Sequence, residues 1–495
     1  MSYSEYKDTL IKIADIKSAA SLMQWDQETY MPEKSADMRG KQLATMQELS
    51  HRLFTDPKFG DLMENLLLKG ELTETERKNV ELSLYDHNKN KKLPGSFVRK
   101  LSEAVSKCFQ AWISARKANS FLLFEEPLEI LVKLKREEAE FLEYNEVPYD
   151  ALLNDYERGL TVKKMDSMFS GLVPQLSIIL EKIKNCKQVD DGFLRQNYAK
   201  DKQWQFGLEL LNSMGFDFEA GRQDMSEHPF SISFHNQDVR ITTRVDENDL
   251  GNMCWSCIHE GGHALYEQGL PSQEYGLPLG EACSYSIHES QSRLWENCIG
   301  RGLDFWKFFY PRLQQYFGEK LSTVKLAQFY NGINKVQPSL IRTEADEITY
   351  HFHVLIRYEL EKKLIGGSLT VKEIPAWWNE QYEHYLGVTV PDDRKGCLQD
   401  VHWSHGSFGY FPTYSLGSLY AAQLFQTIEN QLTELYTEIT RGNTAPVLQW
   451  LRNNIHQYGR FYTAEELCIR TTGEGLNPKH FLSYLQKKYN VIYDQ

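Results

Sequence analysis

Apolar residues recur every three or four positions along most of this chain, and this period limits the folds that it can adopt. The stretches 165–184 and 424–436 are clear examples. Such spacing puts the apolar side chains on one face of a helix. No low-complexity linker, internal repeat or shift in composition divides the 495 residues. The pattern predicts an all-α, mainly helical protein folded as a single domain over 1–495.

The charge of the chain limits its partners. Acidic residues outnumber basic ones by 68 to 55, which gives a formal net charge of -13. An acidic protein is a poor partner for nucleic acid or for an anionic membrane surface. No stretch approaches the roughly 20 apolar residues that a membrane-spanning helix needs. The polar segment 1–12 lacks the apolar core of a secretion signal. We therefore expect a cytoplasmic protein without nucleic-acid or membrane partners.

The eight cysteines are spread thinly over the chain, so we expect no structural disulfides. Cys254 and Cys257 have the Cys-x-x-Cys spacing of redox and zinc sites. They lie inside a predicted helix, without the βαβ context of a thioredoxin-like motif. We interpret them as packing residues.

Strand-like alternation of apolar and polar residues appears in 229–245. Phe230, Ile232 and Phe234 alternate with polar residues before the turn-forming segment 235–238. The pattern predicts a short β-hairpin in a helical protein. One of its edges could pair with an extended peptide. The alternative, a hairpin that only covers the core, stays open.

The strongest functional signal is His-Glu-Gly-Gly-His at 259–263, in a predicted helix over about 249–268. Four residues of helix place His259 and His263 about 40° apart and one turn along, so both imidazoles can reach one metal ion. Glu260 is turned away from the ligand direction but stays near the ion. This is the position of the general base in zinc peptidases.

Catalytic zinc keeps three protein ligands and one open position, so a third ligand is needed. Glu289 is the best candidate, because it lies on the next predicted helix, 282–299, after a loop rich in Gly and Pro. That helix could return antiparallel to the first one and bring a carboxylate beside the histidines. A solvated surface glutamate is the alternative.

Two glycines interrupt the metal-binding helix. Gly261 and Gly262 each cost a helix about 1 kcal/mol relative to Ala. We expect that a neighbouring element or the substrate approaches the backbone closely at these positions.

Several ordered motifs resemble the carboxypeptidase Taq family of zinc metallocarboxypeptidases, along nearly the whole chain. Beside the His-Glu-Gly-Gly-His motif, the shared segments are His228-Pro229-Phe230, Asp238-Val239-Arg240-Ile241-Thr242, His288-Glu289-Ser290-Gln291, Gly396-Cys397-Leu398-Gln399-Asp400-Val401-His402-Trp403, Trp25-Asp26-Gln27-Glu28-Thr29, Met31-Pro32 and Arg342-Thr343-Glu344-Ala345-Asp346-Glu347. No metal or general-base position departs from the family pattern.

The resemblance implies a zincin-like, neurolysin-like ellipsoid with a long deep groove. The zinc would lie at the floor of the groove, with one small hairpin or sheet beside it. Helices over about 1–75 would act as a partial lid, and the enzyme would be a homodimer. The cofactor would be one Zn²⁺ per chain, held by His259, His263 and Glu289, with Co²⁺ as a possible substitute.

The family removes single residues from peptide C-termini with broad side-chain preference, so substrates would carry a free carboxylate. Arg342 is the first candidate to bind that carboxylate, since a guanidinium can donate two hydrogen bonds to it. Arg240 is the second candidate. Each could instead be a structural arginine. Gln399 is a weaker candidate for holding the end of the substrate or His402.

The predicted chemistry is attack of activated water on the scissile carbonyl, with Glu260 first taking and then returning a proton. The developing oxyanion needs further donors. His402 and Tyr414 are the candidates for this role, and Tyr410 lies in the same aromatic stretch. A core histidine and packed tyrosines are the alternatives.

Other functions remain open at this point. An oligopeptidase or a dipeptidyl carboxypeptidase would use the same zinc site. A di-iron carboxylate bundle would use the Glu-x-x-His pairs Glu48 with His51 and Glu260 with His263. A non-catalytic protein that binds peptide or metal is the third alternative, although the presence of Glu260 speaks against it.

Overall fold

The structure is a computed structural model that describes residues 2–493, and it is mainly helical, as predicted. Contacts divide the chain into two compact units. The first comprises residues up to 90, 189–333 and 420–476, and the second comprises 91–188, 334–419 and the residues from 477 on.

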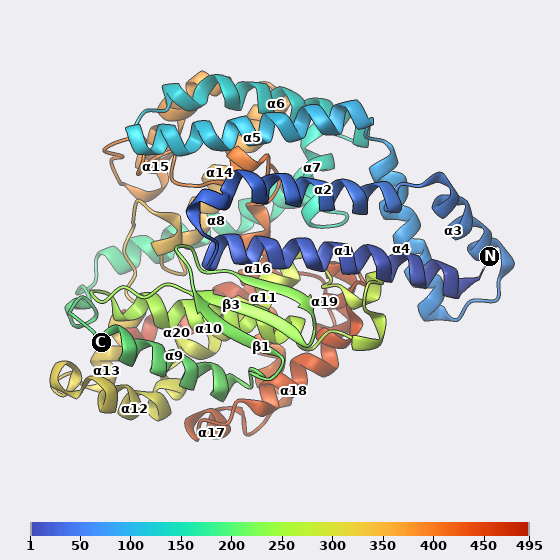
Figure 1. Ribbon diagram of the computed structural model, residues 1–495. Helices are drawn as coiled ribbons and strands as arrows, with labels where there is room; N and C mark the ends of the chain where they lie inside the picture. Colours follow the sequence, from blue (N-terminus) through green and yellow to red (C-terminus); the bar gives the residue numbers. More distant parts are fainter. Residues whose placement is uncertain (1, 494–495) are drawn as a thin grey trace. The chain divides into compact units, whose positions relative to one another are not determined.

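The first unit contains a three-stranded sheet, and Figure 1 labels its main elements. Its helices and strands are α1 (Tyr3–Thr29), α2 (Ala36–Phe54), α3 (Pro57–Lys69), α4 (Glu74–Lys91), α9 (Lys200–Met214), β1 (Gly221–Met225), β2 (Ser231–His235), β3 (Asp238–Thr243), α10 (Leu250–Glu267), α11 (Tyr285–Arg293), α12 (Leu303–Leu321), α13 (Leu326–Ile333), α17 (Leu435–Thr440), α18 (Ala445–Asn454) and α19 (Ala464–Thr472). A π-helical segment, Leu294–Gly300, follows α11 directly.

The second unit is helical in the part of the chain that the structure describes. Its helices are α5 (Gly95–Ala118), α6 (Leu122–Leu142), α7 (Pro148–Tyr156), α8 (Val162–Lys184), α14 (Tyr350–Gly366), α15 (Ile374–Leu386) and α20 (Pro478–Tyr493). Helix α16 (Pro412–Gln431) contributes residues to both units.

The predicted hairpin is present as β2 and β3, which pair antiparallel in the register Ser231 to Ile241. Strand β1 was not predicted; it pairs parallel with β3 on its other side and gives the order β1-β3-β2. Helix α10 packs against β2 and β3, and α1 packs against β2. Strand β2 is therefore an edge strand of a sheet that lies directly against the helix with the predicted metal ligands.

The predicted helix over 165–184 is confirmed as α8, whose buried residues recur with helical period from Met165 to Ile183. The predicted helix over 424–436 is wrong in part, because α16 ends at Gln431 and a new helix begins at Leu435. Apolar spacing persists across this break, so the period alone did not reveal it.

The N-terminal helix α1 is fixed by its own core. Tyr6, Leu10 and Ile13 on one face of α1 are buried against Phe59 and Met63 of α3. Ser2 caps the N-terminus by accepting a hydrogen bond from the Glu5 backbone N–H. At its other end, Trp25 is buried, and the guanidinium of Arg240 lies 4.5 Å from its ring centroid. Helix α1 is thereby held to the sheet.

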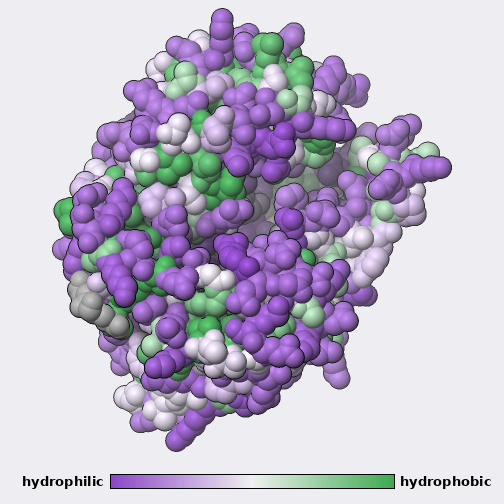
Figure 2. All heavy atoms as spheres, turned by 90° about the vertical axis from the view of Figure 1, so that its left-hand side faces the viewer, coloured by the Kyte–Doolittle hydropathy of each residue, from purple (hydrophilic) through white to green (hydrophobic). Residues whose placement is uncertain are grey.

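Polar residues cover most of one face of the molecule (Figure 2). In Figure 2 the drawn face is mostly hydrophilic, with hydrophobic residues in smaller groups among the polar ones. Within residues 2–493, no helix combines the length and apolar character needed to traverse a bilayer.

Candidate metal centre and peptidase site

The metal motif lies on α10, close to the predicted bounds. Asp249 caps the helix by accepting a hydrogen bond from the Gly251 N–H. Cys254 and Cys257 are buried and free, and Cys257 Sγ lies 3.0 Å from Gln223 Nε2. These contacts confirm that the two cysteines are packing residues.

The two glycines of the motif sit where neighbouring elements approach α10. A Cβ on Gly262 would lie 2.7 Å from Ser292 Cα and 2.8 Å from the Gln291 carbonyl oxygen, both on α11. A Cβ on Gly261 would lie 2.7 Å from a methyl group of Leu211 on α9. The expected close approach is therefore confirmed, and at Gly262 it is backbone against backbone.

This approach brings the third predicted ligand to the two histidines. Glu289 Oε2 lies 3.7 Å from His259 Nε2 and 3.4 Å from His263 Nε2. One ligand atom from each of the three residues lies within 4.8 Å of the others. Glu289 is buried, so the alternative of a solvated surface glutamate is wrong.

The spacing of these atoms fits a zinc-sized ion. Ligands bound to zinc at about 2.1 Å in tetrahedral geometry lie about 3.4 Å apart. Two imidazoles and one carboxylate are also a known ligand set of catalytic zinc. Among residues 2–493, no other set of three His, Cys, Asp or Glu side chains comes this close together.

A carboxylate orients the first histidine. Glu296, in the π-helical segment, lies 2.9 Å from His259 Nδ1. Arg301 Nη2 lies 3.1 Å from the other oxygen of Glu296. Burial raises the pKa of Glu296, but the His259 hydrogen bond and Arg293 outweigh it and hold the pKa well below its usual range. Glu296 is thus a carboxylate that can keep a proton on Nδ1 and leave Nε2 free to bind metal.

Arg293 holds the ligand carboxylate. Its Nε donates to Glu289 Oε1 over 2.7 Å, one helical turn away on α11. Burial raises the pKa of Glu289, but Arg293 and His259 outweigh burial and bring the pKa well below its usual value. For His263, burial lowers the pKa to about 3, which keeps this imidazole neutral. Glu289 and His263, as candidate ligands, are therefore both in the form that binds a metal ion.

The candidate general base lies beside the ligands. Glu260 is buried, and burial raises its pKa to about 7 despite the nearby His259. A hydrogen bond with Ser231 of β2 favours the charged form. A carboxylate with a pKa near neutrality can both accept and return a proton.

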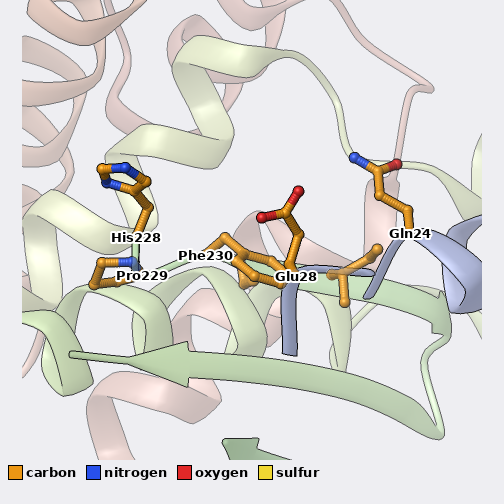
Figure 3. A pocket seen from close by; sticks show the side chains of 7 residues that line it. Gln24, Glu28, His228, Pro229 and Phe230 are labelled. Atoms are coloured by element: carbon orange, nitrogen blue, oxygen red, sulfur yellow. The ribbon is translucent and has the colours of Figure 1, made fainter. Parts of the chain in front are cut away.

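A hollow of about 350 Å³ adjoins Ser231. It is lined by residues of α1, of the segment before β2 and of the start of β2, namely Gln24, Glu28, His228, Pro229, Phe230, Ser231 and Ile232. Figure 3 shows the side chains of Gln24, Glu28 and His228 projecting to the same side. The family-like segments at 25–29 and 228–230 therefore meet beside the residue that contacts Glu260.

The candidate oxyanion residues lie together in the second unit. His402 Nε2 is 3.1 Å from the Tyr414 hydroxyl, and the Tyr410 ring packs against both side chains. Burial, reinforced by Arg342, lowers the pKa of His402 to about 3. His402 is therefore a neutral imidazole that touches a phenol, not a histidine enclosed by apolar groups alone.

Arg342 is buried in the same unit and already has partners. Its Nε donates to Asp400 over 3.0 Å, and Nη1 donates to the Tyr350 hydroxyl over 3.1 Å. Asp400 also binds Arg357, so two guanidinium groups share this carboxylate. A guanidinium has five N–H groups. The contacts with Asp400 and Tyr350 do not use all five N–H groups of Arg342.

The other two candidate substrate-binding residues are also engaged. Arg240 forms a two-bond ion pair with Asp238, with donor-acceptor distances of 2.8 and 2.9 Å. The Gln399 carbonyl accepts from the Arg342 backbone N–H and from Arg357, not from His402. Gln399 thus holds the segment that carries Arg342.

Sequence reasoning missed the residues that support the ligands. Arg293 lies four residues after Glu289, so helical spacing could have suggested it. Glu296 gave no such signal, because its contact with His259 depends on the π-helical segment. Ser231 gave no signal, since its contact with Glu260 joins a strand to a helix.

A di-iron site would need the second Glu-x-x-His pair, Glu48 with His51, as ligands beside Glu260 and His263. Glu48 and His51 are both exposed on α2. They are not part of the group of close ligand atoms around His259.

Comparison with known proteins agrees with this site. The family described as carboxypeptidase Taq (M32) metallopeptidase matches residues 5–489. Thermostable carboxypeptidase 1 of Thermus thermophilus is 40% identical, over 97% of this chain and 96% of the relative.

Solved structures extend the likeness to the whole fold. The crystal structure of an M32 carboxypeptidase from Deinococcus radiodurans has a TM-score of 0.97 at 35% identity, over 100% of this chain and 99% of that one. A structure described as "The Structure of CHT" has a TM-score of 0.96 at 55% identity, over 98% and 99% of the two chains. The chain therefore belongs to the carboxypeptidase Taq (M32) family of metallopeptidases, and it is a metallocarboxypeptidase.

Proposed function

We propose that this enzyme releases single C-terminal residues from peptides, with one Zn²⁺ held by His259, His263 and Glu289 and with Glu260 as the general base. The observation that carries the proposal is the convergence of three ligand atoms beside a buried carboxylate. A divalent ion bound there supplies a Lewis acid that acidifies water and polarises a carbonyl group.

Glu260 supplies the proton transfers in this proposal. As a carboxylate it accepts a proton from the attacking water, and it then donates this proton to the leaving amine. The hydrogen bond with Ser231 orients the carboxylate and favours its charged form. No covalent enzyme intermediate is required, since water attacks the carbonyl carbon directly.

The edge of β2 is proposed to bind the peptide backbone. The Phe230 carbonyl accepts a hydrogen bond from the Thr242 N–H over 2.8 Å. Backbone groups alternate in direction along an antiparallel pair, so those of Ser231 point away from β3. Ser231 therefore offers its backbone at the edge and its side chain to Glu260. A peptide added at this edge would bring its carbonyl groups close to the general base.

The hollow next to Ser231 is proposed to receive a substrate side chain. Gln24, Glu28 and His228 give it polar walls, while Phe230 and Ile232 add apolar surface. Mixed walls of this kind suit side chains of several types, which supports the expected broad preference.

His402 and Tyr414 are proposed to donate to the oxyanion that forms during attack. A neutral imidazole and a phenol both carry an N–H or O–H that can be donated. In their mutual hydrogen bond, at 3.1 Å, one of the two groups is the donor. The bond positions the pair, and the group that donates in it must redirect its proton to the oxyanion. Tyr410 packs against both and is proposed to orient them.

Arg342 is proposed to bind the free carboxylate of the substrate. Burial lowers its pKa, but Asp400 outweighs burial and keeps the guanidinium charged. Gln399 is proposed to help by holding the Arg342 backbone. Arg240 is the second choice, because its ion pair with Asp238 and its contact with Trp25 already suit a structural role.

Digestion of a mixed peptide set, followed over time by mass spectrometry, tests this function. Single-residue ladders that stop on chelation and resume when zinc is added back would support the proposal. Dipeptide steps or internal cuts would support a dipeptidyl carboxypeptidase or an oligopeptidase, which the family match does not favour. No cleavage after metal addition would support a non-catalytic protein that binds peptide or metal. Activity restored by Co²⁺ would support it as a substitute ion.

The remaining expectations are also proposals. The family match runs through both compact units, which supports a single catalytic domain over 1–495. Residues about 1–75 are proposed to form a partial lid over a groove, supported by the contact of α1 with β2. A cytoplasmic location is proposed from the thin spread of the eight cysteines along the chain, which does not suit a disulfide framework. A homodimer is proposed from the family resemblance, and sedimentation of the purified protein would test it.

A further inference from the structure

The two histidine ligands are supported in different ways. His259 contacts the carboxylate of Glu296 directly. His263 instead contacts a second imidazole, with its Nδ1 2.6 Å from His288 Nδ1. The other ring nitrogen of His288, Nε2, lies 2.9 Å from Glu267 Oε1. Glu267 is the last residue of α10, and His288 comes directly before Glu289 on α11.

The order of these atoms fixes where the protons lie. A neutral histidine that binds metal through Nε2 carries its proton on Nδ1. His263 must then donate to His288, whose Nδ1 can accept only if it is unprotonated. The proton of neutral His288 is therefore on Nε2, where it is donated to Glu267. The three residues form one directed chain of hydrogen bonds from the carboxylate to the ligand.

The opposite arrangement would prevent binding. His263 Nε2 is the nitrogen that lies near Glu289. If it carried the proton, it would have no lone pair with which to bind the metal ion. The carboxylate of Glu267 disfavours this arrangement, since it offers only acceptors to His288 Nε2. Both supporting side chains are mostly buried, with 23% of His288 and 19% of Glu267 exposed, so water competes little for their hydrogen bonds.

We propose that His288 and Glu267 are positioning residues that set the tautomer and orientation of His263 and thereby raise the affinity for metal. The proposal rests on the ligand role of His263 given above. Glu267 acts only through His288. In this respect it differs from Glu296, which contacts its histidine directly.

The test is the dissociation constant for zinc of the full-length protein, measured by competition with a chromogenic chelator. His288→Phe leaves the Nδ1–H of His263 without an acceptor. Its zinc affinity should fall by about 10- to 100-fold, the usual cost of losing such a partner. His288→Gln restores an acceptor and should recover most of the affinity. Glu267→Ala should weaken zinc binding in the wild-type background. It should cause little further loss in the His288→Phe background, because the chain of hydrogen bonds from Glu267 to His263 is already broken there.

Two controls separate the proposal from its alternatives. Glu319→Ala removes an exposed glutamate of α12 and should leave the zinc affinity unchanged. The visible spectrum of the Co²⁺ form gives a readout of ligand geometry that is independent of turnover, and it should change in His288→Phe but not in Glu319→Ala.

The outcomes distinguish this proposal from the proposed function. Wild-type zinc affinity in both His288→Phe and Glu267→Ala, together with loss of binding in His263→Ala, would overturn only the role of His288 and Glu267. Full additivity of the two losses would also overturn it, since Glu267 would then act independently of His288. Wild-type affinity in His263→Ala would instead overturn the ligand set itself.

Discussion

The backbone of Ser292 on α11 lies so close to Gly262 on α10 that a Cβ on Gly262 would be only 2.7 Å from Ser292 Cα. This contact sets the distance between the helix that carries the two histidines and the helix that carries Glu289. A glycine that costs helix stability is thus required by the close approach of the two helices that carry the proposed metal ligands.

Gly262→Ala should therefore destabilise the protein by about 1–3 kcal/mol, because backbone atoms must move to admit the methyl group. It should also weaken zinc binding, since α11 carries Glu289. Gly171→Ala in α8 is the matched control, because a Cβ there meets nothing within 4 Å. That substitution should be neutral or stabilise by up to about 1 kcal/mol. Urea unfolding and zinc competition measure both effects. Unchanged stability and affinity in Gly262→Ala would refute the packing argument.

Glu260→Gln should keep its zinc and lose turnover by at least about 100-fold, as expected for removal of a general base. Metal content and kcat, measured on the same preparation, check this. Turnover within a few-fold of wild type would remove Glu260 from the mechanism.

The same substitution should change how stability depends on pH. Burial raises the pKa of Glu260 from 4.5 to about 7, so the folded state holds this proton more tightly than the unfolded state. The stability that this provides is complete below pH 4.5 and is lost as the pH rises through 7, by an amount on the order of 3 kcal/mol. In the absence of metal, the gain in stability of Glu260→Gln over wild type should therefore be larger at pH 8 than at pH 5. Zinc should reduce the difference, because a cation favours the carboxylate. A difference that does not depend on pH would contradict the assignment.

Arg342→Ala should reduce kcat/KM for free-carboxylate peptides about 10- to 100-fold more than for amidated ones, the cost of a charge-assisted hydrogen bond. Arg240→Ala is the comparison, because it also removes an arginine that is paired with an aspartate. Equal losses on both peptides in Arg342→Ala would show a structural effect. If only Arg240→Ala lost the preference for free-carboxylate over amidated peptides, Arg240 would be the residue that binds the substrate carboxylate.

His402→Ala should lower kcat by about 100- to 1,000-fold with little change in KM, because the oxyanion exists only during the reaction. Tyr414→Phe should have a smaller effect in the same direction, since it removes one donor and leaves the imidazole in place. Steady-state kinetics on a single peptide separate the two parameters. A rise in KM at constant kcat would contradict the oxyanion role.

Features that depend on neighbours in sequence could be predicted from the chain. The helix over about 249–268 was predicted from the residues around the motif, and the four-residue spacing of His259 and His263 then predicted that both reach one ion. The need for a third ligand pointed to Glu289. The alternation around Phe230 predicted the hairpin of β2 and β3. These patterns are local, so the rest of the fold does not have to be known.

Features that depend on distant segments could not be predicted. Strand β1 pairs parallel with β3, and its polar sequence gives no alternation that would reveal it. Glu296 and Glu267 look like ordinary helix-surface glutamates until the packing of α10 and α11 is known. The break between α16 and α17 follows no proline or glycine, so apolar spacing continued across it.

The most direct test of the account is a crystal structure of the zinc-loaded protein with anomalous data collected on both sides of the zinc absorption edge. We expect one zinc peak per chain, bonded at about 2.0–2.2 Å to His259, His263 and Glu289, with Glu260 beside it but not bound. A peak elsewhere, or a Glu289 side chain turned away from the two imidazoles, would contradict the account.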